Sequence, residues 1–280
     1  MLSTAFPEER MAQQEVNDDG VPDRVTRETR DDVAILTLND ADRLNALSDE
    51  MRAALLTGVE AAMADQGIRA IVVTGAGGNF SAGGDMRQMI VSATPDPART
   101  RRRLMPLHRL IELVASGPKP VIAAVEGAAF GAGLSLAAVC DFVVAGHGAR
   151  FGAAFSKIGL ASDCGLVWSL PQRVGRTLAR DLMFTGRPVM AEEAHRIGIV
   201  DQLVPAGNAL ATALEKAADY QGVAPLSIAA MKFAFAQGPG SLSEVLALEQ
   251  QQQPMLSMTG DHAEGLAAFR EKRPAKFTGF

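Results

Sequence analysis

Two glycine-rich segments carry the first sign of chemistry in this sequence. Ser81-Ala-Gly-Gly-Asp85 follows an apolar run at 69–74, and Phe130-Gly-Ala-Gly133 follows a second apolar run at 120–125. Turns of this composition expose backbone N–H groups and let a ligand approach the main chain closely. Two N–H groups that converge on one carbonyl oxygen form an oxyanion hole. Small residues here would equally permit close packing of a helix on a strand, so both interpretations stay open.

Other glycine, serine and histidine patterns do not fit a catalytic or cofactor motif. Gly75-Ala-Gly77 is followed by Phe80 where a dinucleotide fingerprint needs its third glycine, and no Walker lysine follows either glycine cluster. Ser135 lacks the second glycine of a nucleophile elbow. The four histidines have no metal-ligand spacing, so we expect no metal site.

The negative charge of the chain is concentrated near its beginning. The 27 Lys and Arg residues against 32 Asp and Glu residues give a net charge of −5. Residues 1–32 hold nine acidic residues and four arginines, which accounts for all of it, and the other residues sum to zero. A neutral body with an acidic tail argues against nucleic acid as a partner, because phosphate binding needs a basic face.

The sequence gives no sign of membrane insertion or export. The uncharged runs, such as Gly127 to Cys140, are shorter than the roughly 18–20 residues that span a bilayer. The N-terminal segment lacks the basic and apolar regions of a secretory signal. The two cysteines, Cys140 and Cys164, make no disulfide framework and are interpreted as buried reduced thiols. We therefore expect a cytoplasmic protein without a membrane partner.

The hydrophobic pattern predicts an α/β fold. Strands alternate with helices in the first two thirds of the chain, and the last third is mainly helical. We expect strands at 33–38, 69–74, 120–125, 141–144 and near 199–204, and helices at 48–64, 98–115 and, after a tight turn, within 127–139. The predicted organisation is a mobile acidic extension at 1–24, a core at 25–205 and a helical region at 206–280.

Ordered segments along most of the chain match one known superfamily. They are Asp42–Leu47, Asn79–Asp85, Lys119–Gly127, Gly131–Gly133, Cys140–Asp141, Arg150–Gly152, Ile158–Leu160, Leu170–Gly175, Thr185–Gly186, Ala194–Gly198 and Phe269–Phe277. On these motifs the chain resembles the crotonase, or enoyl-CoA hydratase/isomerase, superfamily over about residues 25–280. It is most similar to the epoxyphenylacetyl-CoA isomerase and enoyl-CoA isomerase subgroup. The resemblance implies a spiral of ββα turns with a helical C-terminal region that builds trimers, often hexamers.

The resemblance also assigns site residues. Gly84 and Ala132 occupy the two oxyanion-hole positions, whose N–H groups would bind the thioester oxygen of an acyl-CoA. No cofactor is implied beyond the coenzyme A that the substrate carries. Asp85 has a competing interpretation as the cap of the next helix. The implied substrate-binding residues are Arg43, Leu44, Ala46, Ala82, Asp85, Met86, Ser135, Phe155, Leu160, Lys276 and Phe277.

The sequence departs from the superfamily where its hydratases carry two catalytic glutamates. Ser135 and Phe155 stand at those positions, and neither is a general base at neutral pH. A different carboxylate, Asp163, falls where the isomerase subgroup carries its catalytic aspartate. Asp163 has a competing interpretation as the N-cap of a helix that opens at Cys164, and the two roles are compatible.

Asp163 and the two oxyanion donors suffice for one kind of chemistry. An enolate stabilised by the oxyanion hole lets a single carboxylate lift a proton from carbon 2 and return it to carbon 4, which shifts a double bond without adding water. The expected activity is acyl-CoA double-bond isomerisation. The alternatives are a hydratase that recruits Asp163, a coenzyme A binding protein without turnover and, more distantly, a dehalogenase, whose tryptophan is replaced here by Phe155.

Two further features allow more than one interpretation. Glu126 stands where the superfamily commonly has asparagine, and we favour a structural pairing with an arginine over a role as a second acid. Four arginines could meet the phosphates of coenzyme A or form a solvated helix face, and the solvated face is favoured. They are Arg99, Arg101, Arg102 and Arg103.

Overall fold

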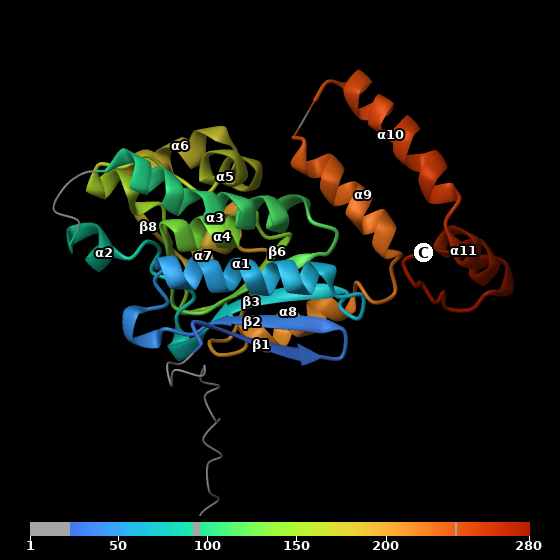
Figure 1. The fold of residues 1–280 in the computed structure, drawn as a ribbon, viewed down its shortest axis with the longest axis horizontal. Helices are drawn as coiled ribbons and strands as arrows, with labels where there is room; N and C mark the ends of the chain where they lie inside the picture. Colours follow the sequence, from blue (N-terminus) through green and yellow to red (C-terminus); the bar gives the residue numbers. More distant parts are fainter. Residues whose placement is uncertain (1–22, 92–95, 239) are drawn as a thin grey trace, which may run out of the picture.

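A six-stranded sheet forms the centre of the computed structural model, which describes residues 23–91, 96–238 and 240–280 (Figure 1). The first strand runs antiparallel to its neighbour and the other pairings are parallel. The strands lie in the order β1 (Val25–Arg30), β2 (Val33–Leu38), β3 (Ala70–Gly75), β4 (Val121–Val125), β6 (Phe142–Gly146) and β9 (Gln202–Val204). The predicted extension at 1–24 falls almost wholly outside the described residues.

A second, three-stranded sheet lies beside the first. Its strands are β5 (Ala128–Phe130), β7 (Arg150–Gly152) and β8 (Pro188–Met190). The β5 and β7 strands are parallel, and β8 is antiparallel to β7. Because β5 directly follows β4, the chain passes from one sheet to the other just before the second glycine-rich segment.

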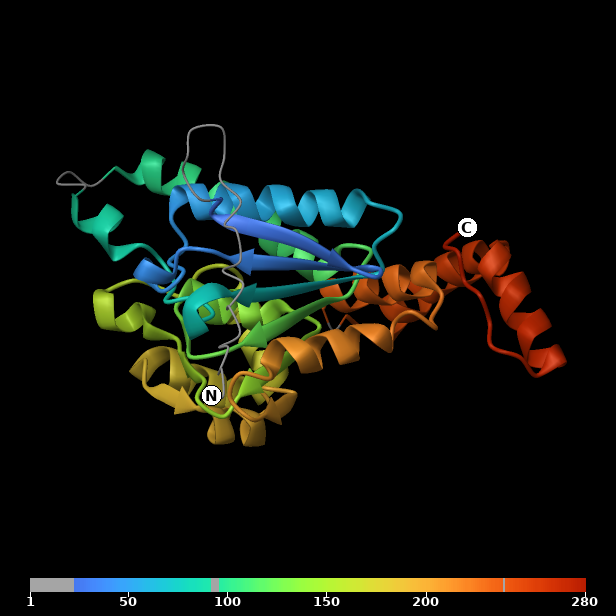
Figure 2. The ribbon, with the colours of Figure 1, turned by 90° about the horizontal axis from the view of Figure 1, so that it is seen from below.

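Helices cover both faces of the large sheet. The helices α1 (Asp49–Ala64), α3 (Pro97–Ser116) and α4 (Ala132–Val139) cover one face, and α8 (Ala209–Ala218) covers the other, as Figure 2 shows for α1 and α8. The remaining core helices are η1 (Ala41–Arg43), η2 (Ala76–Gly78), α2 (Met86–Val91), η3 (Ala154–Ile158), α5 (Leu166–Val174), α6 (Arg176–Thr185) and α7 (Ala191–Ile197).

Alternate residues of each central strand face opposite layers, as the two-residue period of a strand requires. On β3, Ile71 and Val73 face the α1 and α3 layer, whereas Val72 faces α8. The helix α8 meets this second face with small residues, including Ala213. Both faces of the sheet are therefore buried, which explains why the strands are continuous apolar runs.

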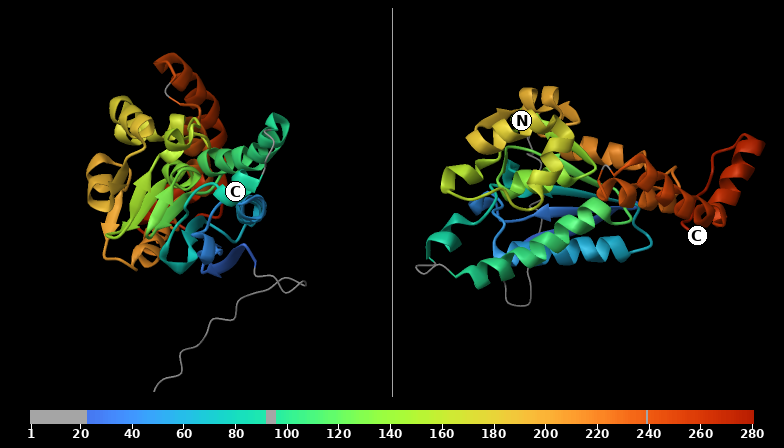
Figure 3. Two further views of the ribbon diagram at one scale, coloured as in Figure 1. Left: turned by 90° about the vertical axis from the view of Figure 1, so that its left-hand side faces the viewer. Right: turned by 90° about the horizontal axis from the view of Figure 1, so that it is seen from above.

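The C-terminal arm consists of α9 (Pro225–Ala236), α10 (Leu242–Ser257), α11 (Gly260–Glu271) and the tail that follows them. Figures 1 and 3 show these helices projecting from one side of the core. The buried Lys232 fixes α9 to the core, because its ammonium group donates to the carbonyl oxygen of Val114 at 2.9 Å and pairs with the Asp141 carboxylate. The arm therefore has a defined anchor on the core.

The structure confirms the predicted long elements and adds short ones. The strand at 33–38 and the helix at 49–64 lie as predicted, and the Ser48 hydroxyl caps that helix by accepting from the N–H of Met51 at 3.2 Å. The three-residue strands β5, β7 and β8 were not predicted. In the part of the chain that the structure describes, no helix is long and apolar enough to cross a bilayer.

Candidate active site

The two glycine-rich segments meet at one edge of the sheet. They follow the neighbouring parallel strands β3 and β4, whose carboxyl ends lie at the same edge. The Ser81 N–H donates to the Ala128 carbonyl oxygen at 2.8 Å, and the Phe130 N–H donates to the Ser81 carbonyl oxygen at 2.9 Å. This pairing brings the segments together, as the oxyanion-hole interpretation requires.

Glycine is needed in both segments because they pack backbone against backbone. A Cβ at Gly83, where φ is +92°, would lie 2.5 Å from the Phe130 carbonyl oxygen. A Cβ at Gly133 would lie 2.5 Å from the Ser81 carbonyl oxygen. Gly131 has φ of +51° and ψ of −124°, a conformation that only glycine adopts readily. Close packing and the exposure of N–H groups are therefore two results of the same geometry.

Gly84 and Ala132 follow these tight contacts directly. Ala132 is the first residue of α4, so its N–H has no acceptor within the helix. Gly84 pairs in a short bridge with Leu47, and its N–H donates to no acceptor among the described residues. A Cβ at Gly83 would lie 3.3 Å from the Ala132 nitrogen, so the two segments place both N–H groups in one small region. Their role as oxyanion donors stays a prediction.

Asp163 is attached to α4 through its backbone and to its neighbour through its side chain. The fully buried Ser135 hydroxyl donates to the Asp163 carbonyl oxygen at 3.1 Å. The Cys164 thiol donates to Asp163 Oδ1 at 2.9 Å. Asp163 is partly buried, so its carboxylate remains within reach of a ligand. Ser135 thus holds the backbone of the candidate base against α4.

The interpretation of Asp163 as a helix N-cap was wrong. The helix α5 begins at Leu166, and its N-cap is Gly165, which has a φ of +71° and makes no side-chain cap. The left-handed conformations of Cys164 and Gly165 displace the helix start from Asp163. The carboxylate is therefore not committed to capping α5.

Phe155 lies beside the oxyanion segment, and Leu160 is on the surface. The Phe155 ring is buried, and its Cζ would lie 3.8 Å from a Cβ built on Gly131. Leu160 is 50% exposed. The apolar Phe155 ring therefore lies beside Gly131, which directly precedes the candidate oxyanion donor Ala132.

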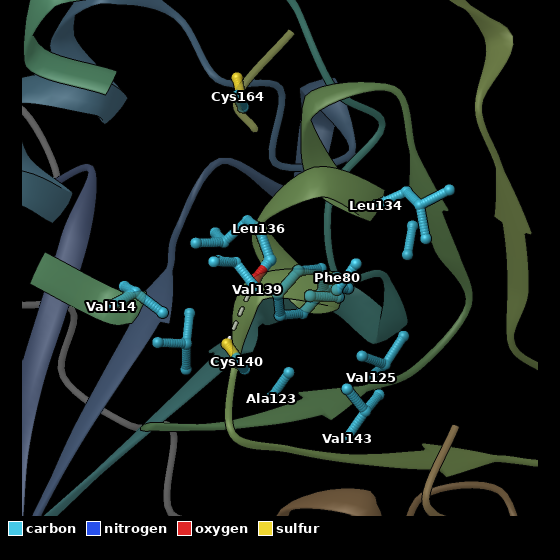
Figure 4. Close-up of a cluster of buried hydrophobic side chains, with 14 of the residues drawn as sticks. Phe80, Val114, Ala123, Val125, Leu134, Leu136, Val139, Cys140, Val143 and Cys164 are labelled. Atoms are coloured by element: carbon cyan, nitrogen blue, oxygen red, sulfur yellow. Dashed lines mark hydrogen bonds between the residues drawn. The ribbon is translucent and has the colours of Figure 1, made fainter. Parts of the chain in front are cut away.

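Both cysteines are buried and unbridged, as predicted. Figure 4 shows the buried face of α4 above Phe80, Ala123, Val125 and Val143, with the Cys140 thiol donating to the Leu136 carbonyl oxygen. Burial raises the pKa of Cys140 to about 12. Burial and the Asp163 carboxylate also raise the pKa of Cys164, so both thiols stay protonated at neutral pH.

The predicted coenzyme A segments lie side by side. The Ala82 N–H donates to the Leu44 carbonyl oxygen at 2.9 Å, and Arg43 Nη1 lies 3.7 Å from Asp85 Oδ2. Leu44 and Met86 are exposed, whereas Ala46 is buried. A cavity of about 390 Å³ opens here and is lined by Arg43, Asp49, Glu50, Asp85, Arg87, Gln88 and Arg99. The structure thus gathers these residues, and their binding role stays a prediction.

Asp85 acts as a helix cap, the competing interpretation for this residue. Its Oδ1 accepts from the N–H of Arg87 at 2.9 Å and from the N–H of Gln88 at 3.3 Å, at the start of α2. The buried Oδ2 has no hydrogen-bond partner among the described residues. The cap therefore leaves one oxygen available for a ligand.

Lys276 and Phe277 lie far from the glycine-rich segments within one chain. The Phe277 carbonyl oxygen accepts from Arg69 at 2.9 Å, and the Lys276 N–H donates to Glu264. Arg69 precedes β3, so the tail lies at the amino ends of the parallel strands, whereas the glycine-rich segments follow their carboxyl ends. Neither residue lines the cavity beside Arg43 and Asp85, and their role in coenzyme A binding stays a prediction.

The prediction that Glu126 pairs with an arginine was wrong. No arginine pairs with it among the described residues; instead its Oε1 accepts from the N–H groups of Gly207 at 2.9 Å and Ala209 at 3.1 Å, at the start of α8. A carboxylate at a helix N-terminus is stabilising. The Glu126 carboxylate therefore attaches the start of α8 to the sheet and makes no hydrogen bond to the glycine-rich segments among the described residues.

Sequence reasoning missed Arg52, a buried cation on α1. It is only 6% exposed, and its Nη1 lies 3.4 Å from Asp49 Oδ1. A signal was present, since Arg52 lies on the helix face that carries Met51 and Leu55. The arginines of α3 differ in their surroundings. Arg101 and Arg102 are exposed, whereas Arg103 pairs with Asp49 at 2.8 Å.

The described residues offer no group of three or more histidine, cysteine, aspartate or glutamate side chains arranged to hold a metal ion. The groups that the structure gathers at this edge of the sheet include backbone N–H groups, carboxylates and guanidinium groups. Such a set suits proton transfer next to a carbonyl group whose oxygen is stabilised as an anion.

The sequence and the fold have clear counterparts among known proteins. Residues 28–279 match the family described as Enoyl-CoA hydratase/isomerase. The 1,2-epoxyphenylacetyl-CoA isomerase of Escherichia coli (strain K12) is 38% identical over 251 residues, which cover 88% of this chain and 95% of that protein. The 2,3-dehydroadipyl-CoA hydratase of the same organism is 36% identical, with 91% and 98% covered.

Solved structures agree with this assignment. An enoyl-CoA hydratase from Polaromonas sp. JS666 superposes with a TM-score of 0.85 at 36% identity, with 90% of this chain and 99% of that chain covered. A putative enoyl-CoA hydratase from Streptomyces coelicolor A3(2) gives 0.86 at 33% identity, with 99% and 100% covered. The fold is thus the crotonase fold. The chain belongs to the enoyl-CoA hydratase/isomerase family and is an enzyme that acts on an acyl-CoA thioester.

Proposed function

We propose that this enzyme shifts the double bond of an enoyl-CoA, with Asp163 as its single acid and base. The observation that carries the proposal is the arrangement around Ser135. This residue and Phe155 replace the two glutamates of the hydratases, while the Ser135 hydroxyl holds the Asp163 backbone against the helix that begins at Ala132. One carboxylate and two N–H donors then remain for the chemistry.

The proposed mechanism moves one proton. The Gly84 and Ala132 N–H groups donate to the thioester oxygen and stabilise the enolate that forms when carbon 2 loses its proton to Asp163. The electron pair of the old double bond shifts, and Asp163 returns the proton to carbon 4. The product is the conjugated 2-enoyl thioester, and water takes no part. Phe155 supports this outcome, because its buried ring excludes water beside the oxyanion donors.

A hydratase that recruits Asp163 is the main alternative, and relatives named as hydratases favour it. Hydration delivers a nucleophile and a proton together, so it calls for a second group that activates water. Glu126 does not fill that role, because its Oε1 is bound by the amides at the start of α8. A binding protein without turnover is the alternative from another class, and the missing glutamates are its support.

We infer that the enzyme needs no cofactor beyond the coenzyme A of its substrate and that copies of the chain assemble as trimers or hexamers. The C-terminal arm supports assembly, because large apolar side chains on it are exposed in the single chain, among them Phe235 at 77% and Phe269 at 88%. Exposed apolar area on this scale marks an interaction surface. The cytoplasmic location stays a prediction.

The test compares two reactions of the purified enzyme. A 3-enoyl-CoA is followed by the ultraviolet absorbance of the conjugated 2-enoyl product, and a 2-enoyl-CoA is followed for water addition. The proposal expects isomerisation to be much faster than hydration, and both to be lost in Asp163→Asn. Dominant hydration by the wild type would contradict it. Binding of acyl-CoA without either reaction would favour the protein without turnover.

A further inference from the structure

The two oxygens of the Asp163 carboxylate have different surroundings. Oδ1 accepts from the Cys164 thiol at 2.9 Å, whereas Oδ2 makes no hydrogen bond or ion pair with any residue that the structure describes. Asp163 is only partly buried, so its carboxylate is not sealed inside the core. The thiol therefore occupies one oxygen of the candidate base and leaves the other for a ligand.

The backbone that carries this carboxylate is held by two helices. The Asp163 carbonyl oxygen accepts from the Ser135 hydroxyl of α4 at 3.1 Å and from the Leu166 N–H of α5 at 3.1 Å. Both bonds fix the peptide group between Asp163 and Cys164. They do not fix the Asp163 side chain, which can still rotate about its own bonds. The Cys164 thiol supplies the contact that holds the side chain.

Cys164 has a backbone conformation that is uncommon for a residue with a side chain. Its φ is +52°, in the left-handed region, and such conformations cluster at active sites. The Cys164 side chain is 1% exposed. The next residue packs closely on α3, because a Cβ at Gly165 would lie 3.3 Å from Ile111 Cγ2. The core therefore holds this turn in the conformation that directs the thiol to Asp163.

The thiol keeps its proton and so remains a hydrogen-bond donor. Burial, together with the neighbouring carboxylate, raises the pKa of Cys164. A thiol is a weak donor, but a hydrogen bond to an ionised acceptor is stronger than one between neutral groups. The competing interpretation is that Cys164 only fills space in the core, as buried cysteines often do.

We propose that Cys164 is a positioning residue for the candidate base, whose thiol holds Asp163 Oδ1 so that Oδ2 exchanges the proton with the substrate. This proposal rests on the proposed function, in which Asp163 carries the proton. The proton moves from carbon 2 to Oδ2 while the electron pair of the broken C–H bond enters the enolate, and it then moves from Oδ2 to carbon 4. Without the thiol, the carboxylate would lose a fixed orientation toward these carbons.

Two substitutions distinguish positioning from packing. Cys164→Ser keeps a donor but places a hydroxyl in the core, whereas Cys164→Ala removes the donor and stays apolar. Cys164→Ala should lower kcat for a 3-enoyl-CoA roughly tenfold with little change in KM, and Cys164→Ser should stay within about threefold of wild type. Thermal unfolding should show the opposite order or no difference between the two variants. An alanine variant that is as active as wild type, or more active than the serine variant, would overturn the proposal.

Cys140→Ala is the matched control. Cys140 is also a buried thiol, but it donates to the Leu136 carbonyl oxygen and not to the candidate base. The same substitution there should leave kcat unchanged. An equal loss of kcat in Cys140→Ala and Cys164→Ala would attribute both losses to the core and overturn the proposal.

An infrared measurement tests the thiol–carboxylate bond without turnover. In a Cys140→Ala background Cys164 is the only thiol of the chain, and its S–H stretching band moves to higher wavenumber when its hydrogen bond weakens. Asp163→Asn in this background should shift the band upward, because a neutral amide replaces the ionised acceptor. An unshifted band would overturn the proposal.

The two measurements together separate this proposal from the proposed function. Loss of isomerisation in Asp163→Asn with full activity in Cys164→Ala would overturn the positioning role and leave the proposed function standing. Absence of isomerisation in the wild type would overturn the proposed function, whereas the band shift would still support a carboxylate held by the thiol.

Discussion

The Ser135 hydroxyl donates a hydrogen bond to the Asp163 carbonyl oxygen at 3.1 Å. Ser135 stands on α4, whose first residue, Ala132, is a candidate oxyanion donor. The bond therefore ties the segment of the candidate base to the helix of the candidate oxyanion hole. This bond gives Ser135 the geometry of a positioning residue and leads to the first prediction.

Ser135→Ala should reduce kcat more than it raises KM, because the Asp163 segment loses its attachment to α4. Loss of one buried hydrogen bond should also cost about 1 kcal/mol of unfolding free energy. Ser169→Ala is the control, since the buried Ser169 hydroxyl has no hydrogen-bond partner among the described residues. Steady-state kinetics and urea unfolding of both variants provide the measurement. Equal effects of the two changes would contradict a positioning role for Ser135.

Gly83→Ala should destabilise the protein by at least about 2 kcal/mol, because the new Cβ would meet the Phe130 carbonyl oxygen and φ is positive. Turnover should also fall, since the two glycine-rich segments would be forced apart. Gly148→Ala adds the same methyl group where no heavy atom lies within 4 Å, and should change little. Thermal unfolding and activity of the pair check this. A tolerated alanine at 83 would show that close packing of the segments is unnecessary.

Glu126→Gln should leave turnover intact and lower the unfolding free energy by about 0.5–1 kcal/mol. The glutamine oxygen can still accept from the Gly207 and Ala209 amides, but the charge at the start of α8 is lost. Activity assays with chemical denaturation of the variant measure both effects. Abolished turnover with intact folding would instead make Glu126 the second acid of a hydratase.

The buried Cys140 thiol should make stability fall at alkaline pH. Its pKa is raised from 9.0 to about 12 by burial, so the unfolded chain loses this proton first. The contribution is fully present below pH 9.0 and is lost as the pH rises toward 12. Cys140→Ala should show a shallower decline than wild type across this range. Parallel unfolding curves of the two proteins would show that the thiol ionises equally in both states.

The long elements were predictable because their patterns are local. The apolar run at 33–38 and the cap at Ser48 each specify their element without distant contacts. The strands β5, β7 and β8 have three residues each, too few to show a two-residue period. They exist because backbone groups such as the Gly131 N–H find partners in distant segments, here the Gly152 carbonyl oxygen at 2.8 Å.

The candidate site was predictable in its composition and less so in its contacts. The glycine-rich segments and Asp163 stand out from sequence and resemblance alone. The partners of Glu126 lie 81 and 83 residues away and are backbone amides, which no side-chain pattern indicates. The helix α5 begins at Leu166 instead of the predicted Cys164, because Cys164 and Gly165 take left-handed conformations. Asp163 is a favoured capping residue, and the sequence around it does not indicate those conformations.

If Asp163 carries the proton, Asp163→Asn should lose most of its isomerase activity. The measurement is kcat for isomerisation of a 3-enoyl-CoA, with the affinity for a saturated acyl-CoA determined alongside. A positioned general base contributes about 10²–10⁴ in rate. We predict a loss of this size in kcat with affinity largely retained. Isomerisation by Asp163→Asn at the wild-type rate would contradict the account and require another base.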